Sequence, residues 1–184
     1  ISGGNFHGAP AALALDTAAI AVTQMMSISE RRIDRLVNPD SNEGLPAFLA
    51  ANPGLESGFM MAHVAAAAAL NEARVLSHPA SVDNTPTSGG KEDHVSMGMT
   101  AALKLSQISR LFAQTIAIEL VCAAQAVEFR TPLRPAEMLK PWISRIRESF
   151  PTLVTDRFMG EQIETLGLRI SEGNFDDLSE EIGL

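Results

Sequence analysis

The sequence predicts an all-α protein built as a bundle of long helices, and three observations lead to this prediction. Of its 184 residues, 46% are hydrophobic but only 5% are aromatic, so the core is made mainly of Ala, Leu, Ile, Val and Met. Such small and aliphatic side chains favour close helix packing over a β-sandwich. Apolar residues recur at helical spacing along most of the chain. The interruptions gather in two long loops rich in Pro, Gly and Asn.

Three long helices are expected in the first 130 residues. The spacing predicts helices from residue 11 to about residue 37, over 55–77 and over 95–130, the last ended by Pro132 and Pro135. At 1.5 Å per residue the third helix would span ~50 Å. Its apolar residues fall on nearly all sides. We therefore expect it to lie in a bundle shared with other chains or with another part of its own chain.

The loops over 38–54 and 78–94 separate these helices. Connections longer than about 12–15 residues are usually functional or disordered. The second loop is rich in charged residues and contains two histidines, so chemistry is expected there. Shorter helices are predicted over 136–149 and 160–170, followed by an acidic tail from residue 172 that we expect to be solvated.

Composition excludes several classes of protein. The net charge of −8 disfavours nucleic-acid binding, which needs a basic face. The one cysteine, Cys122, cannot form an internal disulfide, which indicates a reducing, cytoplasmic location and a buried thiol. The most apolar stretch, 111–127, contains Gln114, Glu119 and Gln125, which argues against a membrane span.

Metal and nucleophile motifs are weak. No tight zinc spacing is present, although possible ligands cluster in the second loop: His78, Asp83, Glu92, Asp93 and His94. No metal site is therefore predicted, and the acidic residues are expected to favour the start of the following helix. Ser-Gly-Gly occurs twice without a Gly-x-Ser-x-Gly pattern, so a hydrolase is not indicated.

The opening stretch Asn5-Phe6-His7 is unusual because Gly3, Gly4 and Gly8 surround it. Glycines allow backbone conformations that other residues avoid. An amide, an aromatic ring and an imidazole could then be brought close to a ligand. A tight packing turn before the helix is the alternative, and spacing alone leaves both open.

Six blocks of the sequence carry a family resemblance. They are SGGNFHG, SERRIDRL, LPAFL, SGFMMAHVAAAAALNEARVLSHPASVD, PTSGGKEDHVSMG and AIELVCAAQAVEFR. In order and approximate spacing they resemble the aromatic ammonia-lyase and aminomutase family that includes histidine ammonia-lyase. EDHVSM is more similar to the histidine branch than to the phenylalanine and tyrosine branches.

The resemblance implies the C-terminal part of the ammonia-lyase (L-aspartase/fumarase-like) fold, in a helical homotetramer. It also implies a methylidene-imidazolone (MIO) electrophile, cyclised from an internal Ala-Ser-Gly, and a Tyr base. This chain has neither Ala-Ser-Gly nor any Tyr. In the family both lie upstream of SGGNFHG, so the start at Ile1 predicts the C-terminal portion of a longer enzyme. Residues 1–130 would be half of the central bundle with active-site loops, and 131–184 short helices and the acidic tail.

The same resemblance implies the site residues. Glu92 and Phe6 match family positions that contact substrate or electrophile and are the predicted catalytic residues. Asn5, His7 and Lys91 are expected to bind or orient the substrate. Lys91 departs from the family pattern, in which a Gln is usual before this Glu.

The predicted function is therefore elimination of ammonia from L-histidine to give urocanate, by an enzyme of which this chain is a part. The expected partners are the amino acid substrate and the N-terminal remainder of the enzyme, and the isolated chain should be inactive. Three alternatives stay open at this point: another aromatic amino acid lyase, a 2,3-aminomutase, or a non-catalytic helical fragment that only oligomerises.

Overall fold

The computed structural model describes residues 3 and 5–181 and confirms the predicted all-α class. The helices are α1 (Ala9–Val37), α2 (Met60–Leu76), α3 (Gly98–Phe129), α4 (Lys140–Ser149), α5 (Gly160–Ser171) and α6 (Asp176–Glu181). Short 3-10 turns lie at η1 (Ala47–Leu49), η2 (Ser88–Gly90) and η3 (Glu137–Leu139). Within the described residues, β pairing is limited to isolated bridges.

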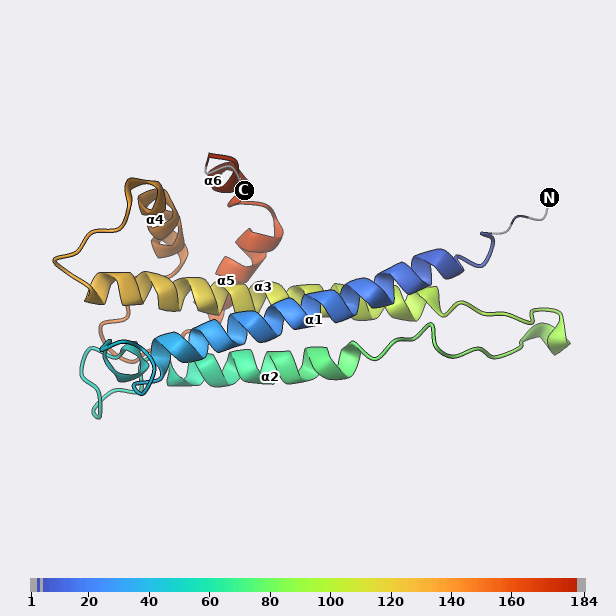
Figure 1. Cartoon of the computed structure of the whole chain (residues 1–184), viewed down its shortest axis with the longest axis horizontal. Helices are drawn as coiled ribbons and strands as arrows, with labels where there is room; N and C mark the ends of the chain where they lie inside the picture. Colours follow the sequence, from blue (N-terminus) through green and yellow to red (C-terminus); the bar gives the residue numbers. More distant parts are fainter. Residues whose placement is uncertain (1–2, 4, 182–184) are drawn as a thin grey trace.

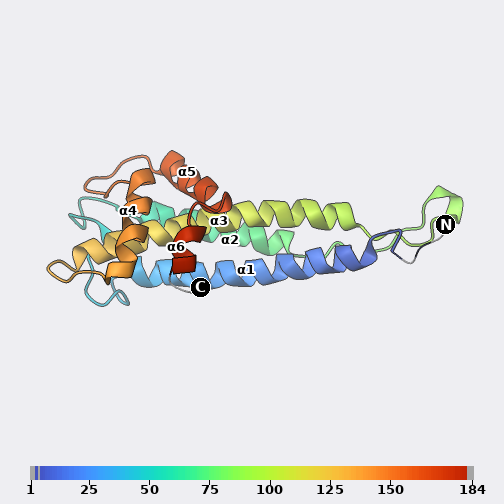
Figure 2. The ribbon, with the colours of Figure 1, turned by 90° about the horizontal axis from the view of Figure 1, so that it is seen from above.

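Helices α1, α2 and α3 form one elongated bundle in which each contacts the other two (Figure 1). The chain runs along the bundle in α1, returns in α2 and runs forward again in α3. The first residues of α1 and α3 therefore lie at the same end, beside the loop 77–97. The shorter helices α4, α5 and α6 gather along α3 near the other end (Figure 2).

Alanines allow the close approach of the three long helices. Ala19 of α1, Ala66 and Ala73 of α2, and Ala117 of α3 are completely buried. Removing such apolar surface from water stabilises the bundle by roughly 25 cal/mol per Å². The small side chains anticipated from the composition thus occupy the contact faces.

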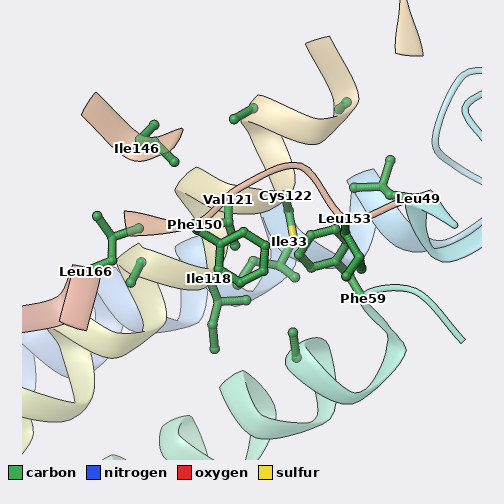
Figure 3. Close-up of a cluster of buried hydrophobic side chains, with 14 of the residues drawn as sticks. Ile33, Leu49, Phe59, Ile118, Val121, Cys122, Ile146, Phe150, Leu153 and Leu166 are labelled. Carbon is green, nitrogen blue, oxygen red and sulfur yellow. The ribbon is translucent and has the colours of Figure 1, made fainter. Parts of the chain in front are cut away.

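The main core lies where the C-terminal segment packs on the bundle (Figure 3). Phe59, just before α2, and Phe150, just after α4, are fully buried with ring centroids 5.8 Å apart. Ile33 of α1 and Cys122 of α3 belong to the same cluster. Buried side chains between residues 146 and 178 therefore pack against the bundle, while the division of the chain at residue 130 stays a prediction.

The helix predicted over 55–77 begins only at Met60. The cause is Gly58, which has φ +54° and whose amide donates to Asp156 Oδ1 at 2.9 Å. A Cβ at Gly58 would lie 2.5 Å from the carbonyl oxygen of Phe48. This left-handed residue in a close backbone approach ends the turn that precedes α2.

The third helix begins at Gly98 rather than at residue 95, because Met97 adopts a left-handed conformation with φ +55°. Within this chain its neighbours are α1, α2 and α5. Large apolar side chains are exposed on α1 and equally on α2: Leu13, Ile20, Met25 and Ile28 on the first, and Met60, Met61, Val64 and Val75 on the second. Sharing of the bundle with other chains stays a prediction.

The acidic tail is not simply solvated, which corrects the sequence-based expectation. Phe175 and Leu178 are 7% and 4% exposed and belong to the main core. Asp177 forms a two-pronged ion pair with Arg145 of α4. Apolar residues at 175 and 178 lie on one helical face, which explains how this charged segment packs.

Helices α1 and α3 are long and apolar enough to cross a membrane by length and composition alone. Half of the apolar 18-residue stretch of α3 that is long enough to span is buried inside the protein. Core helices of soluble proteins can be equally long and apolar, so length and composition alone are weak evidence for a membrane span. The expectation that the protein has no membrane partner stays a prediction.

Candidate functional site

The turn before α1 and the end of loop 77–97 meet at one end of the bundle (Figures 1 and 2). Ser96 Oγ donates a hydrogen bond to the carbonyl oxygen of His7 at 2.5 Å, joining positions 89 apart in sequence. The contact follows from the parallel course of α1 and α3. The two sequence motifs that suggested chemistry are thereby brought together.

The turn over residues 5–8 directs Phe6 outward. Gly8 precedes α1 with φ +66°, its amide donates to the Asn5 carbonyl at 3.0 Å, and its own carbonyl accepts from Ala12 at 3.0 Å. A Cβ at Gly3 or Gly8 would meet no atom within 4 Å. Close packing is therefore not the reason for these two glycines, whereas the left-handed conformation is the reason for Gly8. Gly4 lies outside the described residues.

Loop 77–97 folds back on itself just before the acidic motif. Thr87 and Glu92 pair through two backbone hydrogen bonds, Thr87 N–H to Glu92 O at 2.8 Å and Glu92 N–H to Thr87 O at 3.3 Å. The tip between them takes left-handed conformations at Ser88, Gly89 and Gly90. This tight reversal returns Glu92 toward the bundle and explains the Ser-Gly-Gly string without any nucleophile chemistry.

His7 is the centre of the candidate site. Its Nε2 lies 3.6 Å from Glu92 Oε2, with the two side chains 38% and 44% exposed. Its ring packs edge-on against Phe6, with centroids 5.1 Å apart, and against His94, with centroids 6.4 Å apart. Phe6 itself is 80% exposed. The cluster presents an aromatic ring, an imidazole and a carboxylate on an open surface.

The other two predicted residues, Asn5 and Lys91, lie in the same segments but outside these contacts. Both are exposed. The amide of Lys91 donates to the Ser88 carbonyl at 3.4 Å, and the described part of the chain offers its ammonium no ion pair. The structure thus joins three of the five predicted residues directly and places the other two beside them; none of their roles is tested by these contacts.

A buried ion pair at the root of the loop was not foreseen. Asp16 of α1 is 3% exposed, accepts the Ser81 amide at 2.8 Å and lies 3.5 Å from Lys104 Nζ of α3. Lys104 also donates to the carbonyl of His78. Burial works to raise the pKa of Asp16, but hydrogen bonds from Ser81 and Ala80 and the Lys104 charge outweigh it and lower that pKa. In the sequence, the sign of this ion pair was an aspartate within an otherwise apolar helical stretch.

A second buried carboxylate lies farther along α1. Glu30, 5% exposed, accepts hydrogen bonds from Arg31 at 2.5 and 2.6 Å and lies 2.8 Å from His63 Nε2 of α2. The Arg31 bonds lower the pKa of Glu30 against the opposing effect of burial, with His63 adding to the lowering. This network explains the Glu-Arg pair of the SERR block as a structural link between two helices.

Cavities lie beside the site and at the other end of the bundle. One of about 390 Å³ is lined by His78, Asp83 and Lys104, at the root of loop 77–97. Another of about 530 Å³ lies between the C-terminal parts of α1 and α3, where Arg35 and Arg130 contribute to its wall. No group of three or more potential metal ligands occurs among residues 3 and 5–181.

Comparisons with known proteins agree on one family. The family model for aromatic amino acid lyases matches residues 1–148. Histidine ammonia-lyase of Anaeromyxobacter sp. (strain K) is 52% identical over 96% of this chain and 34% of the relative. The enzyme of the same name from Myxococcus xanthus is 53% identical over 94% of this chain and 34% of the relative. The chain therefore spans about a third of the length of these curated relatives.

Solved structures show the same similarity in three dimensions. Histidine ammonia-lyase from Trypanosoma cruzi matches with a TM-score of 0.91 at 43% identity, covering 98% of this chain and 35% of that one. Tyrosine aminomutase from Streptomyces globisporus matches with a TM-score of 0.92 at 36% identity, covering 97% of this chain and 34% of that one. The ammonia-lyase fold expected from the sequence is confirmed.

Proposed function

The chain belongs to the aromatic amino acid lyase family, and from this premise we propose that it forms part of an enzyme that eliminates ammonia from L-histidine to give urocanate. The single observation that carries the proposal is the Phe6–His7–Glu92 cluster, a carboxylate 3.6 Å from an imidazole beside an exposed aromatic ring. The chain is similar to histidine ammonia-lyases over nearly its whole length, and this similarity supports L-histidine as the substrate.

Glu92 is suited to hold the substrate. A carboxylate accepts hydrogen bonds from an ammonium group and from an imidazole N–H, and histidine carries both donors. With 44% of its side chain exposed, Glu92 remains accessible to a ligand. His7 orients it, and the exposed ring of Phe6 offers an apolar surface to the flat side chain of the substrate.

The residues present fit the methylidene-imidazolone group of the family. A flat, electron-poor ring needs an aromatic or apolar neighbour, and Phe6 is 80% exposed beside His7. When present, the group supplies the electrophile that captures the substrate and makes a proton on the β-carbon of the substrate removable. Phe6 would pack against it, while Glu92 and His7 hold the substrate in position.

The rest of the enzyme belongs to the same proposal. Elimination needs a base and an electrophile, and this chain contains no Tyr and no Ala-Ser-Gly string. We propose that the N-terminal remainder of a longer chain supplies both, and that the enzyme is a homotetramer. We also propose a cytoplasmic location, and its support is the single cysteine, Cys122, which is buried and unpaired.

The test is turnover of L-histidine by the full-length enzyme, followed through the absorbance of urocanate. Glu92→Gln keeps the shape of the side chain and removes its charge. We expect turnover to fall on the order of 10²-fold or more, as for a group that acts in the transition state. Asp93→Asn, a change in the adjacent exposed carboxylate, is the matched control and should leave turnover nearly unchanged. Equal kinetics for wild type and Glu92→Gln would refute the role of Glu92.

A 2,3-aminomutase is the second candidate, because tyrosine aminomutase from Streptomyces globisporus has nearly the same fold over this chain. An aminomutase would return the ammonia and release a β-amino acid. Chiral chromatography of the products separates the two activities. A β-amino acid without urocanate would favour the mutase, whereas urocanate and free ammonia support the lyase.

A further inference from the structure

We propose that Asn84 is a positioning residue that fixes the backbone carrying Glu92, so that its carboxylate stays beside His7. The inference rests on the proposed function, since it explains how the site named there is held in place. Asn84 lies on the outgoing arm of loop 77–97, and Glu92 lies on the returning arm. None of the sequence motifs singled out Asn84.

The side chain of Asn84 bridges the two arms with both of its polar atoms. Its Nδ2 donates to the carbonyl oxygen of Asp93 at 3.0 Å, and its Oδ1 accepts from the amide of Val95 at 2.8 Å. One partner is an acceptor and the other a donor. The side-chain amide of Asn84 satisfies both at once, whereas a carboxylate lacks the donor and an aliphatic side chain lacks both groups.

The bridge acts immediately next to Glu92. The carbonyl of Asp93 belongs to the residue that follows Glu92, while the backbone of Glu92 itself pairs with Thr87. Farther along the same arm, Ser96 Oγ holds the carbonyl of His7. The returning arm is thus held at Glu92 itself and again after it, and the Asn84 bridge is the support that lies next to Glu92 on its C-terminal side.

Local order at Glu92 depends on such bonds because the segment has little else. Apart from the short turn η2 and the Thr87–Glu92 backbone pair, residues 82–94 form no helix or strand, and nearly all of them are exposed. A loop without buried apolar contacts opens easily. The Asn84 bridge is itself exposed, so its loss should disturb the position of Glu92 far more than the stability of the protein.

The experiment is a double-mutant cycle in the full-length enzyme, with kcat and KM for L-histidine as readouts. A misplacement of about 1 Å can reduce turnover ~10²-fold, so we expect Asn84→Ala to lower kcat roughly 10- to 100-fold. In a Glu92→Gln background the same change should cost less than about twofold, because a residue that acts through Glu92 has no further effect once that carboxylate is gone. Thr85→Ala, in the adjacent exposed residue, is the control and should leave kcat unchanged in both backgrounds.

Amide hydrogen exchange provides a readout that does not need activity. Asn84→Ala should speed exchange at the Val95 amide, which loses its acceptor, while Thr85→Ala should not. Equal losses of kcat in both backgrounds would overturn the proposal, because they would indicate a general structural effect. Unchanged exchange at Val95 would overturn it as well. If the wild-type enzyme releases no urocanate, the proposed function fails, and the exchange result alone decides whether Asn84 holds this arm.

Discussion

Gly58→Ala should be among the most destabilising single-methyl changes in this protein. Gly58 lies in the turn before α2 with φ +54°, and a Cβ there would be 2.5 Å from the Phe48 carbonyl oxygen and 3.0 Å from Ala50 atoms. The Phe48 oxygen already accepts the Phe59 amide at 2.8 Å. The added methyl group therefore meets backbone that is fixed by a hydrogen bond, and a side-chain rotation cannot relieve the clash.

The loss of unfolding free energy expected for Gly58→Ala has three contributions. A residue with a Cβ in the left-handed region costs about 1–2 kcal/mol. Overpacking of a tight site typically costs about 1–3 kcal/mol, and a weakened Phe59–Phe48 hydrogen bond costs about 1 kcal/mol more. Together these contributions lower the expected free energy of unfolding by about 3–6 kcal/mol.

The assay is thermal unfolding of the enzyme that contains this chain, followed by circular dichroism at one protein concentration. Gly44→Ala is the matched control, because Gly44 has φ +82° but open space around its missing Cβ. The free energy of unfolding of Gly44→Ala should fall only by the cost of a left-handed backbone at a residue with a Cβ, about 1–2 kcal/mol. If Gly58→Ala destabilises no more than Gly44→Ala, the close approach to Phe48 has no energetic importance and the reasoning is wrong.

Two further predictions concern buried ionisable groups. Because hydrogen bonds from Arg31 lower the folded-state pKa of Glu30, its stabilisation is complete above the ordinary glutamate pKa and disappears as pH falls through the folded value. Glu30→Gln should therefore lower the free energy of unfolding by about 1–2 kcal/mol at pH 7 and by little at acid pH. Denaturant unfolding of both proteins at the two pH values measures this. A difference between variant and wild type that does not change with pH would contradict the assignment. Burial, with a smaller contribution from Glu119, raises the pKa of the Cys122 thiol, so iodoacetamide should label Cys122 only on unfolding. Labelling of Cys122 in the native enzyme, identified by peptide mass, would contradict its burial.

The long helices could be predicted from the sequence because their signals are local. Periodicity and prolines placed α1 and α3 within a few residues of their observed bounds. The start of α2 could not be predicted in this way. It depends on Gly58 and on Asp156, which binds the amides of that turn from a distant part of the chain. The burial of Phe175 and Leu178 likewise needed the three-dimensional contact with α4.

The candidate site could be predicted only as residue types. Family resemblance selected Phe6, His7 and Glu92, and the structure brings these three together. Sequence reasoning missed Asn84 and Asp16, because each acts on backbone groups across the loop or between helices. The bonds of Asn84 leave no motif, since the peptide group of almost any residue can supply the partner. Asp16 did leave a signal, as an aspartate within an otherwise apolar helical stretch.

The Ser96–His7 hydrogen bond also constrains the order of folding, since it closes a loop of 89 positions. Hairpins of neighbouring helices, α1 with α2 and α2 with α3, bring together residues that are closer in the chain, and closing shorter loops loses less entropy. We therefore expect the seam between α1 and α3 to form afterwards. During synthesis the Phe6 turn leaves the ribosome long before its partners exist. We therefore expect the assembled cluster to appear only once the bundle is complete.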